Sequence, residues 1–280
     1  MTSAVLTPDL RLAFIGGGNM ASAIIGGLIR QGLPPSQIQV VEPFEAARER
    51  LARQGVCVLP APSEALAGID LLVWAVKPQS FAEAATAVAP QLRPGTPQLS
   101  VMAGIRAADI AAATGQARIV RCMPNTPALV GRGMTGLFAA TDAASDRVLA
   151  EAVIRTTGEV LWVEREELLD AVTAISGSGP AYVFYFLEAL QQAGTELGLT
   201  AEQARRLAIG TFAGSAQLAA DSPEPLATLR ERVTSKGGTT YAALTTLAEA
   251  GVGPAIVRAA HAAARRAKAL GDEFGRGANA

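Results

Sequence analysis

Short apolar runs alternate with longer, alanine-rich stretches through the first part of the chain, as far as Val163. The apolar runs predict strands, and the stretches between the early runs predict helices. Strands that alternate with helices indicate right-handed crossover units and a parallel sheet covered by helices on both faces. The predicted strands are Arg11–Ile15, Gln37–Val41, Asp70–Val76, Gln98–Met102, Arg118–Cys122, Met134–Phe138 and Val160–Val163. The predicted helices are Asn19–Gln31, Phe44–Arg53, Ser80–Ala89 and Ala107–Ala113. Because Asp70–Val76 is almost continuously apolar, it predicts a central strand.

The pattern changes at Glu164, after which no strand is expected and long Ala/Leu segments predict five or six helices. Thr200 and Gln203 have the spacing of a capping box, which marks a helix start. Ser222 followed by Pro223 predicts another helix start. A chain of 280 residues has the length of two domains, and this change of pattern places their boundary after residue 164.

Two of the C-terminal segments, Pro180–Leu197 and Gln203–Ala219, are apolar on nearly all sides. Such helices are expected to be buried on several sides. A helical domain of this size offers little interior, so we expect it to associate with a second copy of the chain.

The composition excludes several classes of protein. The net charge of −1 argues against a surface that binds nucleic acid or an anionic membrane. Two cysteines provide neither a disulfide scaffold nor a zinc site, and the first ten residues lack the features of a signal peptide. The uncharged stretch Leu12–Ile29 is rich in glycine, which suits a strand, turn and helix better than a membrane span. We expect a soluble protein of a reducing compartment, the cytoplasm.

A glycine-rich turn stands between the first predicted strand and the first predicted helix. Gly16 and Gly18 have the spacing of a dinucleotide-binding turn, with the small residue Ala21 at the third position. Such a turn lets backbone amides and a helix N-terminus face a pyrophosphate. The alternative is a tight turn without a ligand, but the place between strand and helix favours the dinucleotide.

Two further strand ends carry candidate cofactor contacts. Glu42 ends the second strand, where an acid binds the ribose hydroxyls of NAD and repels a 2′-phosphate. Arg48 and Arg50 on the following helix have the reach to bind such a phosphate, and Glu42 can also be read as a solvated strand end. Ala75–Pro78 ends the third strand at the edge where ligands gather. There Lys77 either approaches the cofactor or is an idle surface lysine.

Hydroxyl and glycine residues gather in the run Thr234–Thr240, before an apolar helix expected to start near Tyr241. Together they provide donors suited to a small carboxylate. A helix cap is the alternative, and it explains one of the threonines.

The inventory of reactive side chains favours redox chemistry. The single histidine, His261, lies in an Ala/Arg-rich stretch and is expected on a helix surface. Neither Ser178 nor Cys122 stands in a G-x-S-x-G elbow, and the ligands for a zinc site are lacking. Hydride transfer from a nicotinamide needs no protein nucleophile, because the cofactor carries the reactivity.

Six motifs in order along the chain resemble those of pyrroline-5-carboxylate reductase, the enzyme of the last step of proline synthesis. The motifs are Phe14–Ala21, Ala75–Gln79, Met102–Ile105, Arg121–Pro127, Ser176–Tyr182 and Val233–Thr240. The resemblance implies an oxidoreductase in which NADPH or NADH delivers hydride to the C=N carbon of L-1-pyrroline-5-carboxylate, giving L-proline. It implies an α/β N-terminal Rossmann-type doubly wound sheet that binds the dinucleotide (1–164) and an all-α C-terminal domain for substrate binding and dimerisation (165–280). Homodimers of the family are often assembled into a decamer.

The resemblance also assigns roles to residues. It implies that Ser235, Gly238, Thr239 and Thr240 hold the substrate carboxylate, and that Thr240 hydrogen-bonds or protonates the ring nitrogen. The cofactor contacts that it carries over are Gly16, Gly17, Gly18, Asn19, Met20, Ala75, Val76, Lys77, Pro78 and Ala103. Arg121–Pro127 is expected to line the cleft, with Asn125 and Thr126 as its polar groups.

The chain departs from the family pattern at two positions. Lys236 replaces the usual proline, which adds a charge to the loop or loosens it. Glu42 differs from the pattern of NADPH-preferring members, which opens the question of cofactor preference. Two other functions remain: a related dehydrogenase of another cyclic imine or a hydroxy acid, and a nicotinamide-binding regulator without turnover. A hydroxy-acid enzyme generally needs a general acid or base, commonly lysine or histidine, and the C-terminal region offers no obvious one apart from Lys236.

Overall fold

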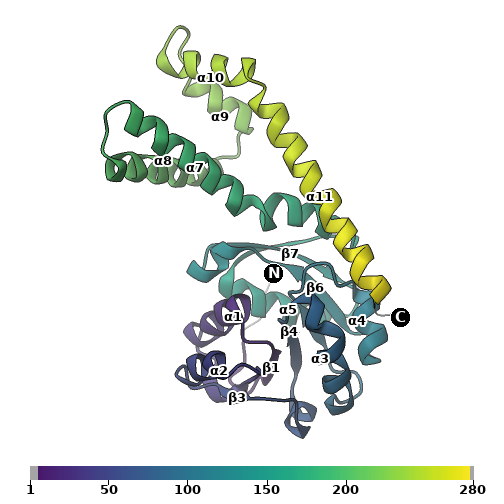
Figure 1. Cartoon of the computed structure of the whole chain (residues 1–280). Helices are drawn as coiled ribbons and strands as arrows, with labels where there is room; N and C mark the ends of the chain where they lie inside the picture. The colour runs from purple at the N-terminus through teal and green to yellow at the C-terminus, as the bar shows by residue number, and fades with distance from the viewer. Residues whose placement is uncertain (1–5, 278–280) are drawn as a thin grey trace. The chain divides into compact units, whose positions relative to one another are not determined.

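The computed structural model describes residues 6–277 and divides into two compact units (Figure 1). Unit 1 is Met1–Ser178 together with Ala263–Ala280, and unit 2 is Gly179–Ala262. The first five positions of the segment in which no signal peptide is expected lie outside the described residues. No helix of the described residues is long and apolar enough to span a membrane.

Unit 1 is built on an eight-stranded sheet with the order β3-β2-β1-β4-β5-β6-β7-β8. The strands are β1 (Leu12–Ile15), β2 (Ile38–Val41), β3 (Cys57–Leu59), β4 (Leu71–Trp74), β5 (Gln98–Ser100), β6 (Ile119–Met123), β7 (Gly133–Ala139) and β8 (Gly158–Trp162). The seven predicted strands are present. The short edge strand β3 was not predicted, because three residues carry too little pattern to stand out.

The prediction of a parallel sheet is wrong at one pairing, beyond which the last two strands, β7 and β8, run opposite to the other six. All neighbours from β3 to β6 are parallel, but β7 runs antiparallel to β6. The chain reverses directly after β6 through the single-turn helix η5 (Thr126–Val130) and Gly131, which has a φ of +70°. No crossover helix separates the two strands, so they pair as neighbours in a hairpin-like connection.

Alternate residues of each central strand face two different hydrophobic clusters. Leu12 and Phe14 of β1 face the cluster that contains α1 (Asn19–Arg30), α2 (Glu45–Ala52) and α5 (Ala144–Ile154). Ala13 and Ile15 face the cluster that contains α3 (Phe81–Val88) and α4 (Ala107–Thr114). The sheet is therefore covered by helices on both faces, as predicted (Figure 1). All four residues of β4 are buried, which confirms Asp70–Val76 as a central strand.

The helix α5 was not among the predicted helices. Its Asp146 is buried, and both carboxylate oxygens accept hydrogen bonds from the guanidinium of Arg118, which precedes β6. This pair ties α5 to the sheet.

The last part of unit 1 follows the sheet. It contains α6 (Leu168–Val172), the π-turn η7 (Thr173–Gly177) and the C-terminal part of α11 (Val252–Gly277). Phe274 of α11 packs against the cluster around α3 and α4. The long helix α11 therefore begins in unit 2 and ends in unit 1.

Unit 2 consists of α7 (Gly179–Glu196), α8 (Ala201–Asp221), α9 (Leu226–Arg232), α10 (Thr239–Glu249) and the start of α11. The capping box is confirmed: Thr200 and Gln203 exchange hydrogen bonds at the start of α8. The predicted helix start at Ser222-Pro223 is wrong, because α9 begins at Leu226 after Pro225. Ser222 instead ends α8, and its hydroxyl accepts a hydrogen bond from the amide of Glu224.

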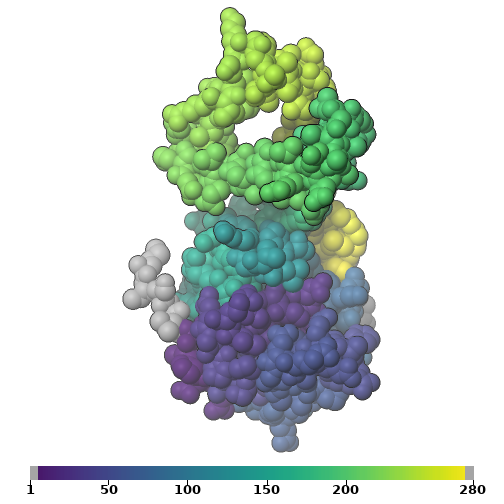
Figure 2. Space-filling view, turned by 90° about the vertical axis from the view of Figure 1, so that its left-hand side faces the viewer, coloured from purple at the N-terminus to yellow at the C-terminus, as the bar shows by residue number. Residues whose placement is uncertain are grey.

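The helices of unit 2 bury few side chains within the chain. None of the described side chains of α7, α9 or α10 is buried, and α8 buries only Ala204 and Ala208. In the space-filling view the green helices of this unit border an open gap (Figure 2). The burial predicted for α7 and α8 on several sides is thus not provided by the chain itself.

Candidate functional site

The first glycine of the glycine-rich turn is required by the backbone. Gly16 has a φ of +97°, in the left-handed region, and a Cβ there would lie 2.6 Å from the carbonyl oxygen of Ala75. Its amide donates to the carbonyl of Val41 at 2.9 Å. The turn is therefore wedged between the ends of β2 and β4, where the strand order reverses and α/β folds bind ligands.

Gly18 faces open space at the start of α1. A Cβ on Gly18 would meet no atom within 4 Å, and this residue is the N-cap of α1 without any side-chain cap. Asn19, the first residue of the helix, is exposed. The first amides of a helix lack intrahelical partners and attract anions. The open space and the absent cap fit the pyrophosphate of a dinucleotide.

Glu42 is buried, with only 6% of its surface exposed. One carboxylate oxygen accepts from the amide of Gly17 at 2.7 Å and the other from the amide of Phe44 at 3.0 Å. The reading of Glu42 as a solvated strand end is therefore wrong. The amide of Gly17 is already bonded to this carboxylate, so the amides that remain for an anion lie further along the turn.

The two arginines of α2 are engaged beside Glu42. Arg48 donates to the carbonyl oxygens of Glu42 at 3.1 Å and Pro43 at 2.5 Å, and Arg50 donates to that of Gly17 at 2.9 Å. Their guanidinium groups lie close to the end of β2. Each guanidinium uses one terminal nitrogen in these backbone hydrogen bonds, and its other N–H donors have no partner of this kind among the described residues.

The other predicted cofactor residues follow parallel strands of the same sheet. Ala75–Pro78 follows β4, and Lys77 is exposed without an ion pair among the described residues. Ala103 follows β5, is exposed, and precedes Gly104, which has a φ of +77°. Because β1, β4 and β5 are parallel, their carboxyl ends and these turns share one edge with the glycine turn.

Asn125 after β6 joins three segments. Its amide nitrogen donates to both the carbonyl and the hydroxyl of Ser176 at 3.2 Å, and its side-chain oxygen accepts from the amide of Met134 at 3.0 Å. Ser176 lies in the π-turn and was not predicted as a partner. The motif Ser176–Tyr182, which is part of the family resemblance, was the available signal.

Cys122 is unsuited to nucleophilic chemistry. The side chain is buried, its thiol donates to the carbonyl of Ser100, and burial raises the pKa of the thiol well above its usual range. His261 is exposed on α11, as predicted. Among the described residues, no group of three or more His, Cys, Asp or Glu side chains is placed to hold a metal ion.

The predicted donor loop lies in unit 2 and forms a tight turn before α10. The amide of Gly238 donates to the carbonyl of Ser235 at 3.0 Å, and Gly237 has a φ of +73°. The helix begins at Thr239 with Gly238 as its N-cap and without a side-chain cap. The helix-cap explanation of the threonines is therefore wrong for α10. Thr234 stands apart, since its hydroxyl donates to the carbonyl of Arg230 and closes α9.

A groove of about 650 Å³ in unit 2 is lined by parts of α9, α10 and α11. Its lining includes Thr234 and Tyr241 but none of the residues from Ser235 to Thr240. The donor loop is thus an exposed turn rather than the wall of this groove.

Comparison with known proteins supplies the family. A pyrroline-5-carboxylate reductase of Pseudomonas aeruginosa is 42% identical over 268 residues, covering 95% of this chain and 98% of that protein. The chain belongs to the pyrroline-5-carboxylate reductase family. Residues 166–270 match the family model for pyrroline-5-carboxylate reductase dimerisation, and residues 11–104 match that for NADP oxidoreductase, coenzyme F420-dependent. The chain is accordingly an NAD(P)-dependent oxidoreductase, and residues 166–270 contain the dimerisation region.

Two solved structures share the fold over nearly the whole chain. A pyrroline-5-carboxylate reductase of Coxiella burnetii is 37% identical with a TM-score of 0.87, covering 94% of this chain and 98% of that one. The pyrroline carboxylate reductase of Plasmodium falciparum, solved with NADP bound, is 27% identical with a TM-score of 0.84, covering 95% and 100%. The Rossmann-type sheet and the helical C-terminal region are therefore those of the family.

Proposed function

We propose that this chain reduces the C=N bond of L-1-pyrroline-5-carboxylate with NADPH or NADH and releases L-proline, the last step of proline biosynthesis. The observation that carries this proposal is the 42% identity to a pyrroline-5-carboxylate reductase over 268 residues. That match spans both units, so it includes the glycine turn of unit 1 and the donor loop of unit 2.

The residues proposed to bind the cofactor lie at the carboxyl edge of the sheet. The amides from Gly18 to Met20 bind the pyrophosphate, and Ala75–Pro78 and Ala103 lie along the rest of the dinucleotide. The uncapped N-terminus of α1 and the open space at Gly18 support this arrangement. The bound nicotinamide supplies the hydride, and the chain holds and orients it.

The residues proposed to bind the substrate come from the donor loop. Ser235, Gly238 and Thr239 bind the carboxylate at the N-terminus of α10, where the helix dipole favours a negative charge. The hydroxyl of Thr240 hydrogen-bonds the ring nitrogen and helps to keep it protonated. A protonated imine accepts hydride more readily than a neutral one, because its carbon is more electron-poor. Lys236, exposed in the same turn, adds a positive charge that attracts the carboxylate.

Glu42 is proposed to favour NADH over NADPH. A carboxylate at the end of β2 accepts hydrogen bonds from ribose hydroxyls and repels a 2′-phosphate. Each of its oxygens accepts one backbone amide, and a carboxylate oxygen has room for a second donor.

The assembly and location are part of the proposal. Residues 1–164 form the dinucleotide-binding domain, and residues 165–280 form the substrate-binding and dimerisation domain. Dimers assemble into a decamer in the cytoplasm. Exposed apolar side chains throughout unit 2 support association, and two free cysteines suit a reducing compartment.

The test is turnover by the purified chain. NADH or NADPH oxidation is followed at saturating L-1-pyrroline-5-carboxylate, and the product is identified by chromatography against L-proline. We expect oxidation that requires the substrate and yields one proline per nucleotide. Nucleotide binding without proline formation would contradict the proposed reaction, and activity on a hydroxy acid instead would favour the alternative dehydrogenase.

A further inference from the structure

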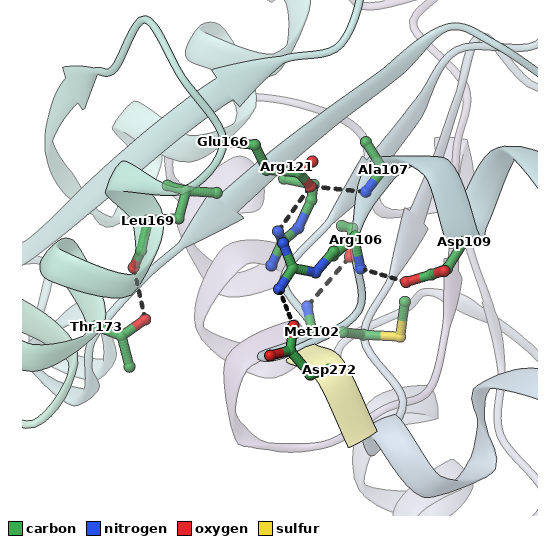
Figure 3. Close-up of polar contacts among 10 residues, drawn as sticks. Met102, Arg106, Ala107, Asp109, Arg121, Glu166, Leu169, Thr173 and Asp272 are labelled. Carbon is green, nitrogen blue, oxygen red and sulfur yellow. Dashed lines mark hydrogen bonds and ion pairs between the residues drawn. The ribbon is translucent and has the colours of Figure 1, made fainter. Parts of the chain in front are cut away.

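The carboxylate of Glu166 in unit 1 joins two segments next to the carboxyl edge of the sheet, where we expect the cofactor to bind. Oxygen Oε1 of Glu166 accepts from the backbone amide of Ala107 at 2.7 Å and from Nη1 of Arg121 at 2.8 Å (Figure 3). Ala107 is the first residue of α4, and Arg121 lies on β6. No sequence motif pointed to Glu166, and the resemblance assigned it no role.

The contact is largely shielded from water. The side chains of Arg121 and Glu166 are 10% and 19% exposed. A charged hydrogen bond that is shielded in this way is stronger than one at the surface. Among the described residues, Glu166 is the only ion-pair partner of Arg121, whose Nε is buried without a hydrogen bond. Loss of Glu166 would leave a buried positive charge unpaired.

The same carboxylate fixes the turn that carries Ala103. The turn from Ala103 to Ile105 leads directly into α4, whose N-cap is Arg106. The amide of Arg106 donates to Asp109 at 3.2 Å, and its guanidinium pairs with Asp272 of α11 at 2.7 Å (Figure 3). Glu166 satisfies the next amide, that of Ala107. The end of the turn is thus held by carboxylates from three segments.

The other side of the turn is closely packed. Gly104 has a φ of +77°, and a Cβ there would lie 3.0 Å from the ring of Phe274. Phe274 therefore bounds the turn on one side and Glu166 holds its other end at Ala107, so that removal of Glu166 frees one of these two supports. Ala103 itself is exposed at the carboxyl edge of the sheet.

We propose that Glu166 is a positioning residue for the nicotinamide cofactor, acting through Ala107 and Arg121 on the Ala103 turn. This rests on the proposed function, because Ala103 is a cofactor contact only in that account. Glu166 touches neither cofactor nor substrate in this proposal. It sets the position of the backbone against which the dinucleotide lies, and its removal should weaken nucleotide binding more than substrate binding.

The test compares Glu166→Ala and Glu166→Gln with the control Glu167→Gln, whose side chain is exposed and has no hydrogen bond or ion pair among the described residues. NADH and NADPH affinity is measured by fluorescence titration, and the KM values for nucleotide and imine are measured separately. Amide hydrogen exchange is followed over residues 101–110. Glu166→Gln keeps an acceptor for Ala107 but loses the charge, so it should fall between Glu166→Ala and wild type.

We expect Glu166→Ala to weaken nucleotide binding about tenfold, the effect of losing one charged hydrogen bond. The KM for the imine should stay within about twofold, and exchange should rise at residues 101–110. The control should match wild type. A lowered Tm with unchanged nucleotide affinity and unchanged exchange at 101–110 would overturn the inference, because it would show a purely structural role. Failure of the proposed function would appear in the wild-type protein, which would bind nucleotide without forming proline. In that case the nucleotide affinity and the hydrogen exchange of the variants would still test whether Glu166 positions the cofactor.

Discussion

The two units of the chain differ in how their apolar side chains are covered. In unit 1 both faces of the sheet carry a buried cluster, and side chains such as Phe14, Ile24 and Trp74 are fully buried. In unit 2 the helices have the same apolar character, yet Phe184 is 65% exposed and Leu207 is 59% exposed. Unit 1 has a complete core of its own, whereas unit 2 needs a surface that the single chain does not supply.

This difference agrees with the family models that the two parts of the chain match. The self-contained unit carries the glycine turn, and the incompletely covered unit falls within the region that matches the dimerisation model. We expect a second copy of the chain to cover the exposed apolar side chains of unit 2, because exposed apolar patches cause association.

The largest effect is expected from a charge on an exposed apolar position of unit 2. Leu207→Glu on α8 would place an unpaired carboxylate in the surface that we expect a second copy to cover, at a cost of several kcal/mol. The dimer should dissociate to a species of half its mass in light scattering. Val148→Glu on α5 is the control, because Val148 is 53% exposed in unit 1, outside the dimerisation match. An unchanged mass for Leu207→Glu would show that this face of unit 2 stays open.

Two glycines of unit 1 form a matched pair, since one methyl group is added in each. Gly16→Ala forces a left-handed backbone and a contact with Ala75, so we expect a loss of about 3 kcal/mol and a Tm lower by about 10 °C. Gly18→Ala adds its methyl to open space and should melt within about 2 °C of wild type. It should nevertheless weaken nucleotide binding about tenfold, because backbone and pyrophosphate must approach closely there. Full affinity in Gly18→Ala would mean that the pyrophosphate binds elsewhere.

Substitutions of Glu42 test the proposed preference of unit 1 for NADH. Glu42→Gln should raise the ratio of kcat/KM for NADPH to that for NADH about tenfold, and Glu42→Arg should raise it further, because the repulsion of the 2′-phosphate is removed. Glu45→Gln, in the exposed first turn of α2, should leave the ratio as in wild type. If neither Glu42 variant shifts the ratio, the carboxylate serves only to fold the glycine turn.

The smallest effect concerns Asp170 in the polar cluster near Glu166. Desolvation raises the pKa of Asp170 above its ordinary value of 3.8, although Arg106, Arg121 and Lys268 lower it, and Asp272 adds to the rise. The folded state then holds this proton more tightly than the unfolded state. Its contribution to stability is therefore present below the ordinary value and is lost as the pH rises through the raised pKa.

Asp170→Asn cannot ionise and should flatten this part of the stability curve, with a change in Tm of no more than about 2 °C. Thermal melting of both proteins between about pH 4 and pH 7 measures it. A steeper pH dependence in Asp170→Asn would contradict the direction of the shift.

Much of unit 1 could be predicted from local pattern. The alternation of Leu12 to Ile15 between two clusters and the buried run around Trp74 follow from the period of a strand. The pattern could not reveal β3, which is three residues long, or the antiparallel pairing of β7, which depends on the single-turn connection at Gly131. Whether a strand runs parallel or antiparallel to its neighbour is set by such connections rather than by the apolar content of the strand.

The candidate site was predictable only in part, for a related reason. The glycine turn and the donor loop each lie in one stretch of sequence, so their residues could be recognised together. Contacts between distant stretches could not. The carboxylate of Glu42 accepts a hydrogen bond from the amide of Gly17 and so helps to hold the glycine turn. Glu166 contacts Ala107 and Arg121 only after folding. Neither contact leaves a local signature.

One substitution tests most directly whether unit 1 binds the nucleotide and unit 2 acts on the substrate. Thr240→Ala removes the hydroxyl proposed to act on the ring nitrogen in unit 2 and leaves the glycine turn of unit 1 intact. Nucleotide affinity and kcat with L-1-pyrroline-5-carboxylate are measured on the same preparation. We expect wild-type affinity for NADH and NADPH, with kcat lowered about a hundredfold. Unchanged turnover, or loss of nucleotide binding together with turnover, would contradict it.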